Sequence, residues 1–121
     1  MKTFDSWAWV EYFKGSKTGA RVRALIEGED ALATPSVCLA EIRAKYLAEG
    51  HDPKDRLRFI KERTSVIDVD SAIAETAADL KIGFRLHMLD ALVLACARSL
   101  DSDLITGDEH FRRVPRVVML G

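Results

Sequence analysis

The sequence predicts an α/β fold, a three-layer α/β/α sandwich with a central parallel β-sheet. Short apolar segments rich in β-branched residues alternate with longer segments of helical periodicity, a pattern typical of parallel sheets covered by helices. The expected connections are short, which limits the possible topologies. The chain has 121 residues, enough for one hydrophobic core and too few for two. We therefore expect residues 1–121 to form a single domain.

In the first half of the chain, glycine and proline residues separate the expected elements. Gly15, Gly28 and Gly50 each end a segment of helical periodicity. Proline is favoured at the first position of a helix, so Pro35 predicts a helix start, with Thr34 or Ser36 as the capping residue. We expect strands at residues 1–4 and 31–33, and helices at residues 6–13, 18–27, 35–49 and 53–63.

The second half of the chain continues this alternation. Val66, Ile67 and Val69 form a β-branched run that predicts a buried strand. Gly83 ends the next segment of helical periodicity, and a helix that is apolar over most of its length lies within residues 89–100. We expect helices from Asp70 or Ser71 to Ile82 and within 89–100, a connector at 84–88, and strands at 65–69, 104–106 and 117–120.

The composition is that of an ordinary soluble protein, with 48% apolar residues, 31% charged residues and a formal net charge of −1. Any contact with nucleic acid must therefore come from a local patch of positive charge. Asp5 and Glu11 deny the N-terminal segment the apolar core of a signal peptide, and no apolar run approaches the length of a membrane span. We expect a cytoplasmic protein without membrane contact, with Cys38 and Cys96 reduced and buried.

Two carboxylates occur where the local pattern favours apolar side chains. Asp90 lies in the helical run LDALVLACA, on the same side of the helix as Val93 and Leu94. Because burying an unpaired carboxylate is costly, Asp90 should have a partner or a chemical task. Asp108 directly follows the expected strand at 104–106, the position where ligands bind in open α/β sheets.

Two further acids belong to the same edge of the expected sheet. Asp5 follows the first strand, and Glu41 lies in the second turn of the helix after the second strand. Four carboxylates in one cleft repel one another unless a cation lies among them. Ligation by oxygen alone suits Mg²⁺ or Mn²⁺ better than zinc. The pattern therefore favours a divalent metal site.

Each acid also has a purely structural explanation. Asp5 and Asp108 are suited to cap the turns that follow them. Glu41 precedes Lys45 by four residues, the spacing of a helical ion pair, and Asp90 could satisfy free N–H groups in the first turn of its helix. Spacing alone leaves both explanations open.

Four segments of the chain resemble the PIN-domain ribonucleases. These are Phe4-Asp5-Ser6 after a short strand, Ala40-Glu41-Ile42-Arg43 in a helix, LDALVLACA with Asp90, and LITGDEHF with Asp108. Their order and separations match that family over nearly the whole chain, and the size is similar to the VapC-type toxins of toxin–antitoxin pairs. The first strand is shorter and more polar than is usual in the family.

The resemblance implies a metal-dependent endoribonuclease that hydrolyses RNA phosphodiester bonds with a metal-activated water. The residues that it assigns to the Mg²⁺ or Mn²⁺ site are Asp5, Glu41, Asp90 and Asp108, with Ser6 and Thr106 as neighbouring hydroxyls. It also implies a homodimer and a cognate antitoxin that blocks the cleft, often with a basic side chain near the metal.

Positive charge near the acids would help to bind RNA. Arg43, Arg85 and His87 lie nearest to Glu41 and Asp90 in the sequence, so we consider them candidates for phosphate contacts. The other Lys and Arg residues between 43 and 63 alternate with acids, which favours a solvated helix face. The aromatic cluster at residues 7–13 favours core packing or a protein interface.

Two other functions remain open at this point. A PIN-like module without catalytic activity would act only through protein partners, and calorimetry of metal binding would separate it from an enzyme. Another metal-dependent phosphate hydrolase is less favoured, because no D-x-D-x-T run follows the first strand and the chain has no Gly-rich phosphate loop. A phosphomonoesterase assay would detect such an activity.

Overall fold

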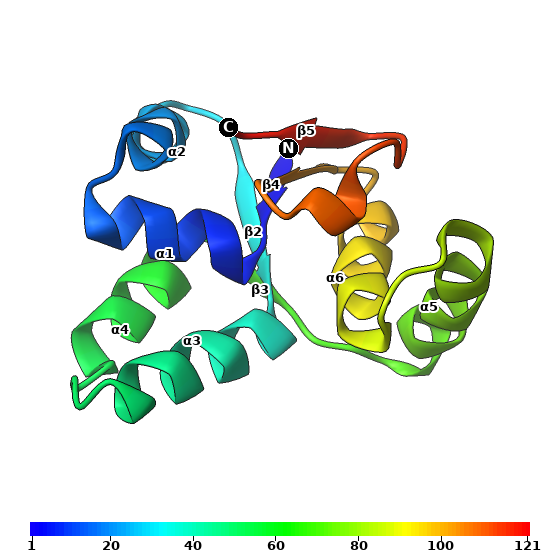
Figure 1. The fold of residues 1–121 in the computed structure, drawn as a ribbon, viewed down its shortest axis with the longest axis horizontal. Helices are drawn as coiled ribbons and strands as arrows, with labels where there is room; N and C mark the ends of the chain where they lie inside the picture. Colours follow the sequence, from blue (N-terminus) through cyan, green and yellow to red (C-terminus); the bar gives the residue numbers. More distant parts are fainter.

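The computed structural model describes residues 1–121 and contains six α-helices around a five-stranded sheet (Figure 1). The strands are β1 (Lys2–Phe4), β2 (Leu32–Pro35), β3 (Ser65–Ile67), β4 (Asp103–Thr106) and β5 (Val117–Met119). The helices are α1 (Ser6–Lys14), α2 (Lys17–Glu27), α3 (Ser36–Ala48), α4 (Lys54–Arg63), α5 (Ser71–Phe84) and α6 (Met88–Ser99), with a 3₁₀ turn, η1 (Glu109–Phe111). The expected alternation of strands and helices is confirmed.

The sheet is parallel throughout and has the strand order β3-β2-β1-β4-β5. From the central strand β1 the chain first builds β2 and β3 on one side, and later β4 and β5 on the other. The strand order therefore reverses between β1 and β4. Ligands of open α/β sheets bind outside the carboxyl ends of the strands at such a switch point.

Helices cover both faces of the sheet. Figure 1 shows α1 to α4 on one side and α5 with α6 on the other. Leu104 and Ile105, neighbours in β4, are both buried but belong to different cores: Leu104 packs with α6 and Ile105 with Phe4 and Trp9. The predicted three-layer α/β/α sandwich is confirmed, as are free, buried Cys38 and Cys96. None of the helices combines the length and the apolar character needed to cross a lipid bilayer.

The start of α3 differs from the prediction. Pro35 does not occupy the first helical position; it is the last residue of β2, pairs with Ile67 and has extended backbone angles. The residue before a proline is itself restricted to extended conformations, so Thr34 continues the strand instead of capping the helix. The strand expected at residues 31–33 is thus a fully buried inner strand that extends to Pro35, and α3 begins at Ser36 without a side-chain cap.

The end of α5 also differs from the prediction. Gly83 lies inside the helix, which ends at Phe84 and is followed by Arg85 as the cap residue in the left-handed conformation (φ 56°). The N–H of Leu86 donates to the Lys81 carbonyl at 3.1 Å, the hydrogen bond that closes a helix in a Schellman motif. Leu86 is buried, so the burial of this leucine offsets the cost of a left-handed arginine.

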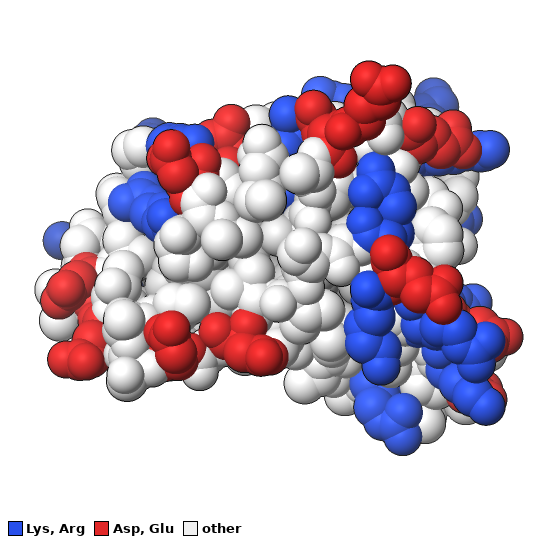
Figure 2. Space-filling view, turned by 180° about the vertical axis from the view of Figure 1, so that it is seen from behind, with Lys and Arg blue, Asp and Glu red and all other residues white.

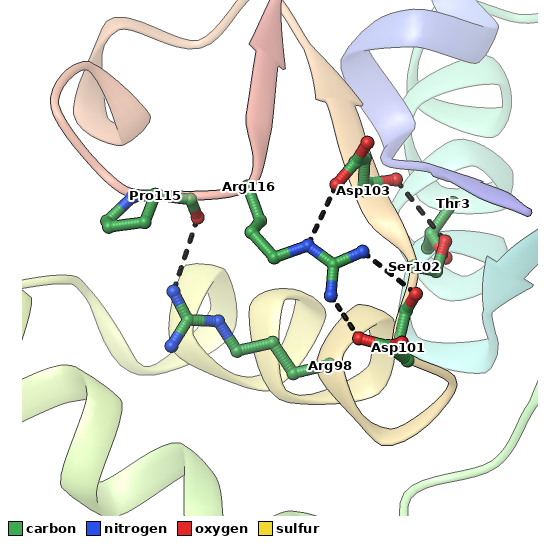
Figure 3. Close-up of polar contacts among 7 residues, drawn as sticks. All are labelled: Thr3, Arg98, Asp101, Ser102, Asp103, Pro115 and Arg116. Atoms are coloured by element: carbon green, nitrogen blue, oxygen red, sulfur yellow. Dashed lines mark hydrogen bonds and ion pairs between the residues drawn. The ribbon is translucent and has the colours of Figure 1, made fainter.

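The edge strand β5 is fastened to the rest of the sheet by Arg116 (Figure 3). Its guanidinium donates to Asp103 Oδ1 at 3.0 Å, to the Asp101 carbonyl at 2.9 Å and to the Asp101 carboxylate. Arg98 of α6 adds a hydrogen bond to the Pro115 carbonyl. These bonds hold the chain at the amino ends of β4 and β5, opposite the edge at which ligands bind.

Candidate metal centre

A cleft of about 380 Å³ opens beside the carboxyl ends of β1 and β4. Its apolar walls include Trp7, Val93 and Phe111. Four carboxylates line the cleft: Asp5, Glu41, Asp90 and Asp108. They come from the end of β1, from α3, from the first turn of α6 and from the loop after β4, so the fold brings together acids that are far apart in the sequence.

Asp5 lies at the inner end of this group and is only 6% exposed. Its Oδ1 accepts a hydrogen bond from the Ala8 N–H at 2.9 Å, which caps α1. Its Oδ2 accepts a hydrogen bond from the hydroxyl of Thr106. Asp5 is therefore both a helix cap and a residue of the cleft, and its carboxylate is held in one orientation.

Thr106 connects Asp5 with Asp108. The buried hydroxyl of Thr106 accepts a hydrogen bond from the Asp108 N–H at 3.0 Å, which leaves its own proton for Asp5. Asp108 in turn accepts a hydrogen bond at Oδ1 from the His110 N–H at 2.9 Å and so caps η1. The structural role that the sequence suggested for Asp108 coexists with its place in the cleft.

Glu41 is held by Ser6, whose hydroxyl donates to Glu41 Oε1 at 2.5 Å. The alternative pairing of Glu41 with Lys45 is not formed, because the Lys45 ammonium lies 2.6 Å from Glu49 Oε2. Lys45 still lines the cleft, where its charge is shared with Glu49. Ser6 thus fixes the carboxylate that extends from α3.

Burial and, to a lesser extent, the neighbouring carboxylates change the pKa values of two of these acids. The pKa of Asp5 is raised to about 7, mainly by burial and also by the nearby carboxylates of Asp108 and Glu41, although the hydrogen bonds from Thr106 and Ala8 lower it. The pKa of Asp90 is also raised, by partial burial and by Asp108. Negative charge is in excess here, so a cation would stabilise the cleft.

The donor atoms of Asp90 and Asp108 fit a divalent cation, and a histidine completes the group. Ligand atoms of Asp90, Asp108 and His110 all lie within 4.8 Å of one another. His110 Nδ1 is 3.5 Å from Asp90 Oδ2 and 3.2 Å from Asp108 Oδ1. His110 was not among the site residues predicted from the sequence; its position two residues after Asp108, in the turn that follows β4, is the signal that could have identified it.

The three basic candidates lie differently from the acids. His87 precedes α6 and packs edge-on against the His110 ring, with the ring centroids 5.2 Å apart. Arg43 and Arg85 are exposed and do not line the cleft. Arg43 follows Glu41 by two residues, which places it on another side of α3.

Seen from behind, Lys and Arg gather over α4 whereas Asp and Glu prevail over α5 (Figure 2).

The aromatic cluster of α1 divides between core and cleft. Trp9 is fully buried against Phe4, with a centroid distance of 5.3 Å, and its indole N–H donates to Thr34. Trp7 is partly exposed and lines the cleft, where its ring covers Gly107. Core packing therefore accounts for Trp9, whereas Trp7 forms a wall of the candidate site.

The model of the PIN domain family matches residues 2–117 of the sequence. The chain belongs to the PIN domain family. The matched region includes all four carboxylates of the cleft, and PIN domains are generally nucleases. None of the curated proteins compared with this PIN domain has a significant sequence match.

Solved structures with the same fold include toxin–antitoxin complexes. A chain of a toxin–antitoxin complex from Klebsiella pneumoniae has a TM-score of 0.83 and 23% identity, over 98% of this chain and 97% of that one. VapBC2 from Rickettsia felis, bound to promoter DNA, has a TM-score of 0.75 and 17% identity, over 98% of this chain and 96% of that one. DNA-bound VapBC from Salmonella typhimurium has a TM-score of 0.70 and 18% identity, over 98% of this chain and 96% of that one. These similarities establish the fold.

Proposed function

We propose that this PIN-domain protein is a metal-dependent endoribonuclease and the toxin of a toxin–antitoxin pair. One observation carries the proposal: carboxylates from β1, α3, α6 and the loop after β4 converge on one cleft at the switch point of the sheet. An acidic group of this kind suits a divalent cation, and oxygen ligands favour Mg²⁺ or Mn²⁺. The resemblance to VapC-type ribonucleases supports RNA as the substrate.

The proposed metal ligands are Asp5, Glu41, Asp90 and Asp108. When bound, Mg²⁺ or Mn²⁺ would lower the pKa of the attacking water and stabilise the charge that develops on the phosphate. Asp90 is partly exposed in the cleft, so its carboxylate is placed to orient a water and to accept its proton. Thr106 and Ser6 are positioning residues, because they hold the carboxylates of Asp5 and Glu41.

The RNA would contact the surface around the cleft. Lys45 and Ser6 both line the cleft and are the candidates for a phosphate contact inside it. We retain Arg43, Arg85 and His87 as candidates for phosphate contacts farther along the RNA backbone. Trp7 presents an aromatic side chain at the cleft wall, which suits stacking with an unpaired base.

The proposed partners are an antitoxin and a second copy of the chain. The fold similarity to three toxin–antitoxin complexes supports the antitoxin, and an acidic cleft is complementary to a basic side chain of such a partner. Ile82, at the end of α5, and Met88 and Leu89, at the start of α6, are exposed apolar residues that suit a protein interface. Sedimentation of the purified protein would measure whether it is a homodimer.

A cleavage assay tests the enzymatic proposal. Purified protein and end-labelled structured RNA should give discrete fragments with Mg²⁺ or Mn²⁺, and none with EDTA. Asp5→Asn and Asp90→Asn should abolish cleavage while the circular dichroism spectrum is retained. Asp79→Asn, which changes an exposed acid of α5, is the matched control and should cleave normally. Full activity of either cleft variant, or cleavage in EDTA, would contradict the proposal.

A growth assay tests the toxin proposal. Expression of the wild-type chain should arrest growth, and co-expression of its antitoxin, to be sought as a small protein encoded by a neighbouring reading frame, should relieve the arrest. Asp90→Asn should be harmless in the same host at equal expression. Growth arrest by Asp90→Asn would mean that the toxicity does not depend on the cleft.

A further inference from the structure

We propose that His110 supplies a nitrogen ligand to the metal ion, beside Asp90 and Asp108, and that this nitrogen makes the site prefer Mn²⁺ to Mg²⁺. The inference rests on the proposed metal site and adds a ligand and a metal preference to it. His110 is the last residue of the group formed by Asp90, Asp108 and His110, whose ligand atoms lie within 4.8 Å of one another.

The first support is the position of the imidazole nitrogen. His110 Nδ1 lies 3.2 Å from Asp108 Oδ1 and 3.5 Å from Asp90 Oδ2. Bonds of about 2.1 Å to one ion put adjacent ligand atoms roughly 3 to 3.5 Å apart. In the metal-free protein these separations are direct contacts between the imidazole and the two acids, and they also match donor atoms that share an ion, so the ring needs little movement to become a ligand.

The second support is the way in which the His110 ring is held. The backbone N–H of His110 donates to Asp108 Oδ1 at 2.9 Å, so the backbone of the histidine is bound to one of the acids. The next residue, Phe111, is fully buried and anchors η1. The His87 ring packs edge-on against the His110 ring at 69°. Two of these contacts fix the backbone of His110 beside Asp108, and the third is an edge contact to the ring, whose side chain is 57% exposed.

The third support is the balance of charge. Four carboxylates line the cleft, and the one ammonium that lines it, that of Lys45, is paired with Glu49. A neutral imidazole adds a donor atom without adding a fifth negative charge. Nitrogen is a softer donor than carboxylate oxygen, and imidazole suits transition metals, whereas Mg²⁺ prefers oxygen. A mixed nitrogen and oxygen donor set should therefore favour Mn²⁺.

Pulsed electron paramagnetic resonance of bound Mn²⁺ detects a coordinated ¹⁴N nucleus directly. The chain has three histidines, so each can be removed in turn. We expect ¹⁴N coupling in the wild type, in His87→Ala and in His51→Ala, whose imidazole is exposed at the remote turn between α3 and α4. We expect the coupling to disappear in His110→Ala. Coupling that persists in His110→Ala, or disappears in His87→Ala, would overturn the assignment.

Calorimetry of Mn²⁺ and Mg²⁺ binding tests the metal preference. The ratio of the two dissociation constants should change by at least about tenfold towards Mg²⁺ in His110→Ala, the lower range for loss of a group that supports a metal site. His110→Asn, which offers an amide oxygen, should keep binding but lose the preference for Mn²⁺. An unchanged ratio in both variants would contradict the inference.

Thermal unfolding in EDTA and metal binding by the wild type separate this inference from the proposed function. Because His110 is exposed, the thermal unfolding of His110→Ala in EDTA should equal that of the wild type. If the wild type binds neither ion, the proposed function itself fails. If the wild type binds Mn²⁺ without any ¹⁴N coupling, the metal site stands and only the role of His110 is refuted.

Discussion

Thr106 determines how two of the acids lie, although its side chain has no charge. Its buried hydroxyl accepts from the Asp108 N–H and donates to Asp5 Oδ2. Thr106→Val keeps the shape but leaves both partners without this bond, which should cost about 1–3 kcal/mol of unfolding free energy and weaken metal binding. Thr106→Ser should restore both. Urea unfolding and calorimetry measure the two effects; wild-type metal affinity in Thr106→Val would contradict the positioning role.

Asp90 is the acid whose removal should separate catalysis from stability. Its pKa is raised by partial burial and by Asp108, so the charged form is disfavoured in the metal-free cleft. Asp90→Ala should lower RNA cleavage by at least about a hundredfold and leave the metal-free protein as stable as the wild type or more so. Thermal unfolding in EDTA measures the second effect. A clear loss of stability would mean that Asp90 mainly caps α6.

The four acids could be predicted from the sequence, but the residues that hold them could not. Each acid follows a strand or lies in the first two turns of a helix, and that position depends only on local pattern. The hydrogen bond between Thr106 and Asp5 joins residues 101 positions apart, so no local signal indicates it. His110 reaches Asp90 only because η1 turns the chain after Asp108. Arg43 was a candidate for a phosphate contact because it is close to Glu41 in the sequence, but closeness in sequence does not place two residues on the same side of α3.

Among the elements, the packing of α1 against the loop after β4 shapes the cleft. Trp7 lies directly over Gly107, where an added Cβ would come within 2.2 Å of the indole ring. Gly107→Ala should therefore displace Trp7 or the loop that carries Asp108, at a cost of about 1–3 kcal/mol, and reduce metal affinity. Chemical unfolding and calorimetry measure these changes.

Gly83 provides a matched control for this substitution. It lies inside α5, and nothing is within 4 Å of the position of an added Cβ. Gly83→Ala should therefore stabilise the protein by about 0.5–1 kcal/mol and leave metal affinity unchanged. Equal effects of the two substitutions on metal binding would refute the role given to the contact between Trp7 and Gly107.

The boundaries of α3 and α5 illustrate where local rules compete. Proline can begin a helix or end a strand, and at Pro35 the pairing of β2 with β3 decided in favour of the strand. Glycine often ends a helix, but α5 continues through Gly83 until Leu86 can reach the core. Tertiary burial decided both cases, so the sequence predicted the elements correctly and their ends less well.

For the whole molecule, the concentration of acids at the switch point makes stability depend on pH. The unfolded chain releases the Asp5 proton near pH 3.8, because 3.8 is the ordinary pKa of an aspartate. The folded, metal-free protein holds this proton up to about pH 7, because the pKa of Asp5 is raised to about 7. Folding therefore binds a proton in this range, and the stability that Asp5 contributes at low pH is lost as the pH rises through 7. The loss amounts to up to about 4 kcal/mol.

Urea unfolding in EDTA at pH 4.5 and 7.5 measures this dependence. The decrease in unfolding free energy with rising pH should be smaller in Asp5→Asn than in the wild type, because the amide does not titrate. Saturating Mg²⁺ should stabilise the wild type most at the higher pH, where Asp5 is ionised. Identical pH dependence of the two proteins would show that Asp5 titrates normally.

The central claim is that the acids at the switch point form one divalent metal site, and anomalous diffraction tests it most directly. Crystals of the full chain grown with Mn²⁺ should give an anomalous peak in the cleft, within bonding distance of the Asp90 and Asp108 carboxylates. The peak should be absent from Asp90→Ala crystals grown in the same way. A cleft without manganese, or manganese bound only elsewhere on the surface, would contradict the account.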